Sequence, residues 1–393
     1  MEQIDGYCNS FKLKYMYLDK LFNGRLDTKK NGKQVVDTVN IFINFESLYN
    51  IIRRRDVEKY IATATKKEIR QIYRQCISGF INVAAHYREY FNRHKIATNI
   101  VYFYNEISED YIEYNNSAII PEYRHHFVES LTALDRLTVN SLIADSIPFM
   151  DIITEYLDGI HMVGTKRVEA SLIPYIIHMQ NVFPANLNII ITKDEFDYQY
   201  CNKNFIIVSK YCNEPVLLTK YNIMRFLRHK LKYNEGKSDG TKREPIELNP
   251  LLIPFIYSFL GNRKRSIPKI KKFGFSTIYK ALEKLYNIGY IFNEEPDTMS
   301  AVNLCEILNT YGTGMLKNES LRDEILTNYK AYDLDYQYGV TSKSQIENIL
   351  EQLTNKVDPQ ALMDINDKYF EFCPLMLMEL NRYDKKDEIR QYL

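Results

Sequence analysis

A mostly parallel α/β sheet flanked by helices is the fold class that the sequence predicts, and the order of its apolar segments carries the prediction. Four runs rich in β-branched and aromatic residues are typical of buried strands, over residues 39–43, 99–103, 187–192 and 206–208. Helical spacing of apolar residues fills the intervals, over about 46–95, 129–157 and 168–181. Strands that alternate with helices favour a parallel sheet, because parallel neighbours need long crossover connections.

Composition divides the rest of the chain into segments. Residues 1–38 form a polar N-terminal extension, and the α/β domain is expected over 39–233. A polar, Gly-containing linker is predicted over 234–249, followed by helices around a short basic turn over 250–290. Residues 291–393 are predicted to form a mostly helical C-terminal extension. Its amphipathic stripe at 345–353 is expected to pack back on the domain, with binding to a protein partner as the alternative.

Charge and cysteine content exclude several classes of protein. The formal net charge is +1, so a nucleic-acid surface has to be local. The six cysteines include no close pair with zinc-site spacing. No apolar run reaches the length of a membrane helix, roughly 18 residues, so we expect no membrane partner and an intracellular location.

Abundant Tyr, Asn, Ile and Lys without Trp fit AT-rich codons. This compositional bias favours a phage or viral source, with host cytoplasm or the virion as the location.

The residues that follow each predicted strand form a second pattern, since catalytic sites in open α/β sheets lie at the carboxyl ends of strands. The first strand ends at Asn44 and the second is followed by Tyr104. A helical stretch opens with Val168-Glu169-Ala170-Ser171-Leu172. The third strand is followed by Thr192-Lys193-Asp194-Glu195-Phe196-Asp197-Tyr198-Gln199, and a later segment, 261–277, reads GNRKRSIPKIKKFGFST.

In this order, the five segments resemble the motifs of the 5′-nuclease superfamily, the PIN-like fold of flap endonucleases and phage 5′-3′ exonucleases. The last segment is similar to the helix–three-turn–helix signature Gly-Asp-x-x-Asp-Asn-Ile-Pro-Gly-x-x-Gly-Ile-Gly-x-Lys-Thr. The positions that match it are Gly261, Ile267, Pro268, Gly274 and Thr277. The resemblance covers about residues 39–290 and implies a central PIN-like sheet with a helix–three-turn–helix region.

The resemblance also implies a set of acids that hold two Mg²⁺ ions, because Mg²⁺ prefers oxygen ligands. Only Glu169 and Asp194 are acidic among the positions compared, which are 44, 104, 169, 171, 172, 194, 196 and 262. Two carboxylates are expected to hold one Mg²⁺ weakly at most, so no cofactor is required. The alternatives are that both acids only cap helix N-termini, or that Asp197, Glu195, Glu46 or Glu106 completes a shifted acid set.

In the family, the three-turn element grips the phosphates of duplex DNA through backbone amides and a bound monovalent cation. Basic side chains at this turn are expected to add phosphate binding without base recognition, although a charged run can also be a solvated loop. The predicted DNA-binding residues are Arg263, Lys264, Arg265, Lys269, Lys271, Lys272, Ser276 and Thr277, together with Arg53, Arg54 and Arg124.

These features predict a catalytically degenerate 5′-nuclease-like protein that binds nucleic acid, DNA rather than RNA, as a binding or scaffold component of a phage or viral system. One alternative is an active metal-dependent 5′-3′ exonuclease or flap endonuclease with a shifted acid set. Another is a structural or assembly protein that has lost DNA binding.

Overall fold

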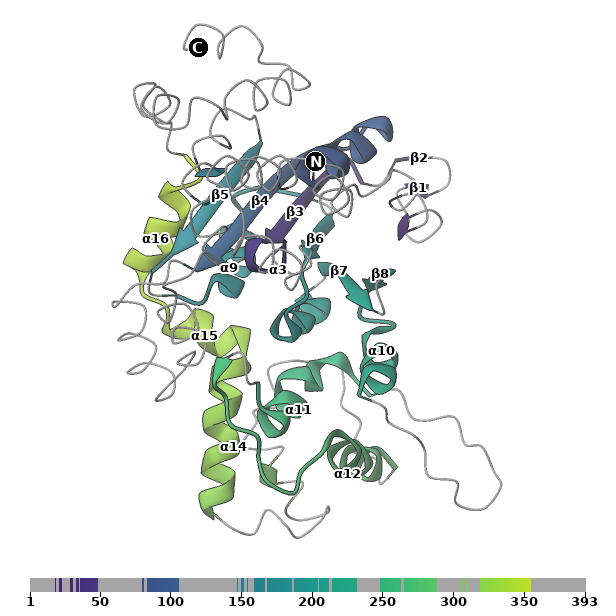
Figure 1. Ribbon diagram of the computed structural model, residues 1–393, viewed down its shortest axis with the longest axis vertical. Helices are drawn as coiled ribbons and strands as arrows, with labels where there is room; N and C mark the ends of the chain where they lie inside the picture. Colours follow the sequence, from purple (N-terminus) through teal and green to yellow (C-terminus); the bar gives the residue numbers. More distant parts are fainter. Residues whose placement is uncertain are drawn as a thin grey trace, which may run out of the picture.

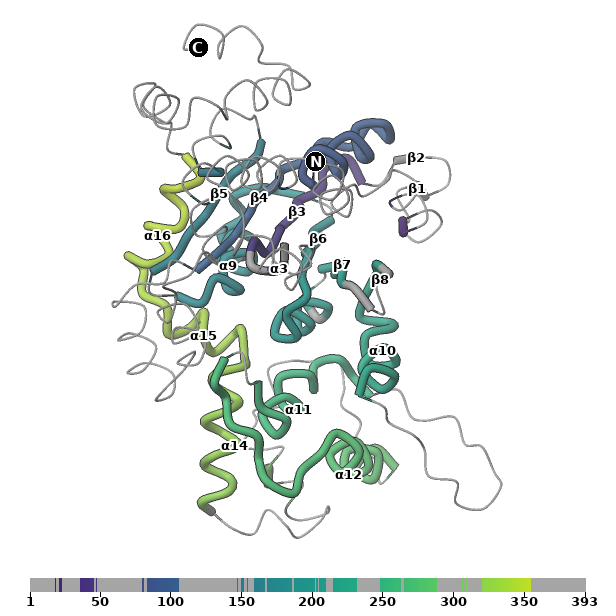
Figure 2. Tube along the Cα trace, in the orientation of Figure 1, coloured from purple at the N-terminus to yellow at the C-terminus, as the bar shows by residue number. Residues whose placement is uncertain are grey.

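A six-stranded sheet forms the centre of the computed structural model (Figure 1). The structure describes residues 29–30, 33–34, 36–48, 83–105, 159–231, 248–287 and 319–354, apart from 167, 186, 204, 212–213 and 263–264. Isolated described positions are 18, 21–22, 80, 147, 150–151, 154, 305–306 and 309. Figure 2 shows the described segments in colour along the chain trace.

The strand order in the sheet is β5-β4-β3-β6-β7-β8. The strands are β3 (Thr38–Asn44), β4 (Ala97–Asn105), β5 (Ile160–Thr165), β6 (Leu187–Ile191), β7 (Phe205–Tyr211) and β8 (Glu214–Leu218). Within this sheet the β7–β8 pair is antiparallel and the other four pairs are parallel. The central strand β3 is buried on both faces, which explains its nearly continuous apolar sequence.

The predicted α/β class and four predicted strands are confirmed by β3, β4, β6 and β7. The strands β5 and β8 were not predicted. The β5 segment contains His161 and Gly164, and β8 contains Pro215, residues that weaken a strand pattern. Both strands lie at the edges of the sheet, where fewer apolar residues are needed.

Parallel pairing brings several strand ends to one edge of the sheet. Asn44 at the end of β3 is in register with Phe103 of β4, and Asn105 ends β4 opposite Thr165 of β5. Thr192 follows β6, whose last paired residue lies beside Ile43 of β3. This carboxyl edge therefore gathers the polar residues that the sequence places after each strand.

Two short helical segments complete this edge. The 3₁₀ helix η3 (Ala170–Leu172) leads directly into α9 (Ile173–Met179), with Pro174 in the first turn, where a missing N–H costs no helical hydrogen bond. The long 3₁₀ segment η4 (Glu195–Lys203) follows β6. The predicted helix at 168–181 is thus present as two consecutive helical segments.

The helical region lies below the sheet in Figure 1. It contains α10 (Ile223–Lys230), η5 (Pro250–Leu252), α11 (Ile253–Leu260) and α12 (Phe275–Asn287). The turn between α11 and α12 begins at Gly261, whose φ of 65° ends α11. A Cβ at this position would lie 2.6 Å from the carbonyl oxygen of Ile267, so glycine is required there.

The described part of the C-terminal extension returns to the domain. It forms α14 (Glu319–Tyr332), α15 (Leu334–Val340) and α16 (Lys343–Glu351), with α14 beside α11 and α16 beside β5 (Figure 1). Gln199 of η4 donates to the Tyr332 carbonyl and accepts from the Leu334 amide. Residues 319–354 therefore contribute to the same core, as the amphipathic stripe at 345–353 predicted.

Candidate functional site at the carboxyl edge of the sheet

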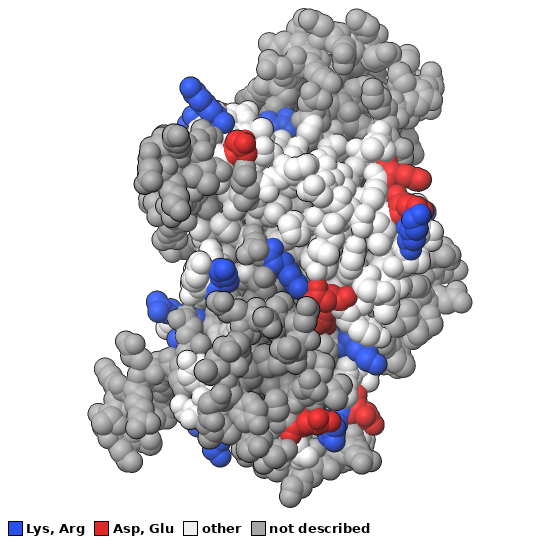
Figure 3. All heavy atoms as spheres, turned by 180° about the vertical axis from the view of Figure 1, so that it is seen from behind, with Lys and Arg blue, Asp and Glu red and all other residues white. Residues whose placement is uncertain are grey.

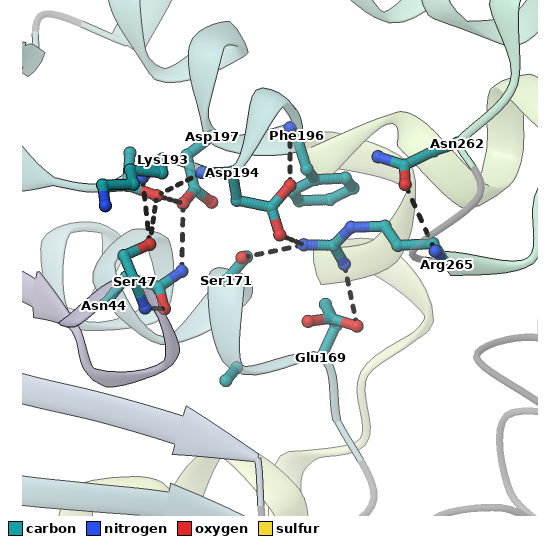
Figure 4. A network of polar contacts seen from close by, with 12 residues as sticks. Asn44, Ser47, Glu169, Ser171, Lys193, Asp194, Phe196, Asp197, Asn262 and Arg265 are labelled. Atoms are coloured by element: carbon teal, nitrogen blue, oxygen red, sulfur yellow. Dashed lines mark hydrogen bonds and ion pairs between the residues drawn. The ribbon is translucent and has the colours of Figure 1, made fainter. Parts of the chain in front are cut away.

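An arginine occupies the centre of the polar cluster at the carboxyl edge (Figure 4). The Nη1 atom of Arg265 lies 2.8 Å from Glu169 Oε2, and its Nη2 atom lies 2.9 Å from Asp194 Oδ2. The Arg265 side chain is 0% exposed, and the two carboxylates are almost as deeply buried. Charge-assisted hydrogen bonds of this length are the strong ones in proteins. One guanidinium thus pairs with both of the acids found at family motif positions, and the triad keeps a formal charge of −1 when both carboxylates are ionised.

The surroundings of Arg265 include Ser171 and Phe196, which stand at positions where the family motifs have acids. Ser171 accepts a hydrogen bond of 3.1 Å from Nη2 of Arg265. The guanidinium carbon lies 4.0 Å from the centroid of the Phe196 ring, which stacks on Tyr332. Leu172 is buried in the hydrophobic core. These substitutions form a pocket that suits a planar guanidinium, with acceptors at its edge and an aromatic ring at its face.

The local structure of the turn explains why Arg265 points inward. Backbone hydrogen bonds join Asn262 and Ile267 in both directions, at 2.9 and 3.0 Å, and close a tight loop. The Asn262 side chain accepts from the Arg265 amide at 3.2 Å. The family signature has Asp at position 262, and the Asn262 side chain here holds the backbone of the residue that supplies the cation.

The structure therefore corrects the sequence-based expectation for Arg265. It was expected among the residues that contact DNA, but a fully buried guanidinium that bonds two carboxylates is not available to a phosphate. A signal for this role is present in the sequence: position 265 stands where the three-turn signature has its second Asp. An arginine at a position where the signature has Asp indicates this buried role better than the basic residues around it indicate DNA binding.

Asp197 forms a second polar group beside this pair. Its Oδ2 atom accepts from Thr192 Oγ1 at 2.5 Å and from Asn44 Nδ2 at 3.3 Å. Burial, and then the nearby charge of Asp194, raise the pKa of Asp197 to about 6. Asp197 thus lies in the cluster, and its role in a shifted acid set stays a prediction.

Glu195, another of the shifted acids, does not join the cluster. Glu195 forms an ion pair of 2.7 Å with Lys230 instead. Glu106 lies outside the described residues, as does the side chain of Glu46.

The surviving acids are more than helix caps. Asp194 does accept from the Phe196 amide at 3.1 Å, in the first turn of η4. Glu169 precedes η3 but makes no side-chain capping bond, and its other oxygen accepts from Asn105 at 3.2 Å. Both carboxylates are directed into the polar cluster, where their main charged partner is Arg265.

A pair of Mg²⁺ ions does not fit these residues. Arg265 lies between Glu169 and Asp194, and Phe196 presents an apolar ring where hydrated cations need oxygen. Within the described ranges, no three His, Cys, Asp or Glu side chains are arranged to hold a metal ion. We therefore derive no metal-dependent step at this edge.

The three-turn element also carries exposed side chains. Lys269, Lys271 and Lys272 are exposed, Ser276 is exposed, and Thr277 is half-buried at the start of α12. The other predicted DNA-binding residues, Arg53, Arg54, Arg124, Arg263 and Lys264, lie outside the described residues. The monovalent cation implied at this turn stays a prediction.

Comparisons with known proteins identify the fold. No family model matches the sequence, and no curated protein matches it. A solved structure of a substituted bacteriophage T5 flap endonuclease, in a pseudo-enzyme-product complex with DNA and metal ions, matches with a TM-score of 0.51 at 11% identity. That match covers 81% of this chain and 100% of the T5 chain. The T5 5′-exonuclease with bound zinc matches with a TM-score of 0.50 at 9% identity, over 80% of this chain and 98% of that one. The expected fold is thus confirmed, since the chain has the fold of the T5 flap endonuclease and 5′-exonuclease structures.

Proposed function

We propose that this chain is a nucleic-acid-binding protein that uses a 5′-nuclease fold without two-metal hydrolysis. Its ligand is proposed to be DNA in duplex or branched form. Its role is that of a binding or scaffold component, in a phage or viral system inside the host cell. The observation that carries the proposal is the ion triad of Arg265 with Glu169 and Asp194.

The triad argues against hydrolysis for a chemical reason. Two-metal nucleases need ions that activate a water and stabilise the leaving oxygen. A guanidinium is a permanent cation and a hydrogen-bond donor, but it has no open coordination position for water. With Arg265 between them, Glu169 and Asp194 each direct a carboxylate oxygen at the guanidinium rather than at a common metal position.

The exposed lysines of the three-turn element support the nucleic-acid part of the proposal. Three lysines within four residues, Lys269, Lys271 and Lys272, are exposed on one turn. Lysines on a turn bind phosphates by charge and read no base sequence. The solved T5 neighbour is a complex with DNA, which agrees with a DNA ligand for this fold.

The test measures binding and cleavage together. Wild type and a Lys269/Lys271/Lys272→Ala variant are titrated with nicked and flapped DNA duplex across salt, with Mg²⁺ or Mn²⁺ present and product length monitored. We expect intact DNA and salt-sensitive binding. In the lysine variant, the magnitude of the slope of log K against log salt should decrease by roughly 0.9 for each phosphate that the variant no longer neutralises.

A matched control removes three exposed lysines from other elements, Lys166, Lys330 and Lys343, and should retain the affinity of wild type. Cleavage that is abolished by Asp194→Ala would overturn the proposal in favour of an active nuclease. The absence of DNA binding at low salt, with a stable protein complex, would favour the structural or assembly role.

A further inference from the structure

A row of exposed aromatic and basic side chains runs along α10 and the turn before it. Tyr221, Arg225 and His229 are exposed and separated by four residues each, so they follow one face of the helix and the turn before it. The opposite face buries Ile223, Met224 and Leu227. The row is about 12 Å long at helical rise. We call these three residues, with Lys220, the α10 row.

The α10 row is exposed and carries no negative charge of its own. Tyr221 is 77% exposed, the most of any large apolar side chain in the described part of the chain. The Lys220 ammonium lies 5.3 Å from its ring centroid. The α10 sequence, IMRFLRHK, contains no acid. The Tyr221 ring does not pack in the core, so it is accessible to a ligand from solvent.

The other basic side chains of α10 have partners within the domain. Lys230 pairs with Glu195, and the Arg228 guanidinium lies 6.0 Å from the Tyr279 ring of α12. They fix α10 against η4 and α12, which places the α10 row on a rigid element. Viewed from behind, the left part of the lower half of the molecule shows blue atoms and no red ones among the described residues (Figure 3).

We propose that the α10 row binds single-stranded nucleic acid, by stacking a base on Tyr221 and binding the flanking phosphates through Lys220 and Arg225. The inference rests on the proposed nucleic-acid function but uses a different surface. An exposed ring on a helix can stack on an unpaired base, whereas the bases of a duplex are already stacked on one another. Basic groups beside the ring then supply charge for the sugar-phosphate chain.

The arrangement suits a branched substrate. In a flap or a gapped duplex, paired and unpaired segments are joined, and each can be bound by one of the two surfaces. The lysines of the three-turn element would bind duplex phosphates, while the α10 row would hold unpaired nucleotides. Two separate surfaces predict that the two kinds of binding can be removed independently.

The experiment uses the full chain and two fluorescent probes, a dodecamer of thymidylate and a fully paired hairpin, at low salt. Tyr221→Ala should weaken binding of the dodecamer by roughly five- to 100-fold, and Tyr221→Phe should retain it, since the ring is preserved. Hairpin binding should be unchanged in both variants. The Lys269/Lys271/Lys272→Ala variant should show the reverse pattern.

Tyr336 provides a matched control. It is also exposed, at 39%, and a lysine, Lys330, lies 5.6 Å from its ring, but Asp333 and Asp335 are close in sequence. Tyr336→Ala should leave dodecamer binding unchanged. Equal dodecamer affinities for wild type and Tyr221→Ala, with hairpin binding intact, would overturn this inference alone. Failure to bind either probe would overturn the proposed function as well, and preferential binding of poly-glutamate would assign the row to an acidic protein.

Discussion

The guanidinium of Arg265 lies 2.9 Å from the carboxylate of Asp194, although the two residues belong to different parts of the fold. Asp194 follows β6 of the sheet, whereas Arg265 belongs to the turn between α11 and α12. The same turn carries the exposed Lys269, Lys271 and Lys272. The buried ion pair therefore joins the predicted DNA-binding turn to the α/β domain.

Removal of Arg265 should destabilise the protein strongly. Arg265→Met leaves the carboxylates of Glu169 and Asp194 buried without their cation, which costs about 3–5 kcal/mol in the free energy of unfolding. Urea unfolding followed by circular dichroism measures the loss. The exposed Arg225→Met is the control and should change stability by less than about 0.5 kcal/mol. A loss for Arg265→Met as small as that of the control would contradict a buried ion triad.

Combined neutralisation should restore part of this loss. In Arg265→Met with Glu169→Gln and Asp194→Asn, no buried charge of the triad is left unpaired, and well-packed neutral replacements of ion pairs are often tolerated. We expect the triple variant to be more stable than Arg265→Met alone, measured by the same urea unfolding. Additive losses instead would show that the three residues act independently.

Divalent cations should stabilise an Arg265 variant but not the wild-type protein. Arg265→Ala opens a space between two carboxylates, where an ion can take the place of the guanidinium. At 100 times its dissociation constant, such an ion adds about 2.7 kcal/mol of stability. Thermal unfolding with millimolar Mn²⁺ or with EDTA measures the shift in Tm. Asp194→Asn in the same background should abolish it, and a shift of similar size in wild type would show that the native site already takes a metal.

The fold was predictable because its core strands are long and apolar, and because the family motifs follow them in order. The strand β3, with the sequence TVNIFIN, is buried on both faces, so its apolar residues identify it as a strand without information from the rest of the chain. The edge strand β5 was not predictable in the same way. Its edge is completed by a distant side chain: Gln352 exchanges two hydrogen bonds with the backbone of Gly164.

The site was predictable in its positions but not in its electrostatics. Glu169 and Asp194 were identified from motif spacing, and they lie together as expected. The sign in the sequence that Arg265 turns inward is its position at the second Asp of the three-turn signature, because its neighbours form a basic run and local pattern cannot distinguish a buried from a solvated arginine. The inward direction of Arg265 depends on Asn262, which accepts from its backbone amide. It also depends on Phe196 and Ser171, which contact the guanidinium from other segments.

Loss of the Gln352 amide should weaken the β5 edge. The Gly164 N–H donates to Gln352 Oε1 at 2.8 Å, and Gln352 Nε2 donates to the Gly164 carbonyl at 2.9 Å. Gln352→Leu leaves both backbone groups without these partners, so we expect a loss of about 1–3 kcal/mol. Hydrogen exchange of the Gly164 amide, which should become faster, localises the effect. Asn348→Leu, at an exposed position of α16, is the control and should leave this amide unchanged.

The stability of the protein should depend on the protonation of Asp197. Burial, followed by the charge of Asp194, raises the pKa of Asp197 from 3.8 to about 6 in the folded state. Between these two pH values the folded protein retains a proton that the unfolded chain has released, so this group makes stability fall as pH rises through the window. Asp197→Asn removes the proton equilibrium and can still accept from Thr192. Urea unfolding at pH values from 4 to 7 should therefore give a flatter profile for the variant and a higher stability than wild type at pH 7. The exposed Asp323→Asn should follow the wild-type profile, and a steeper decline in Asp197→Asn than in wild type would exclude Asp197 as the titrating group.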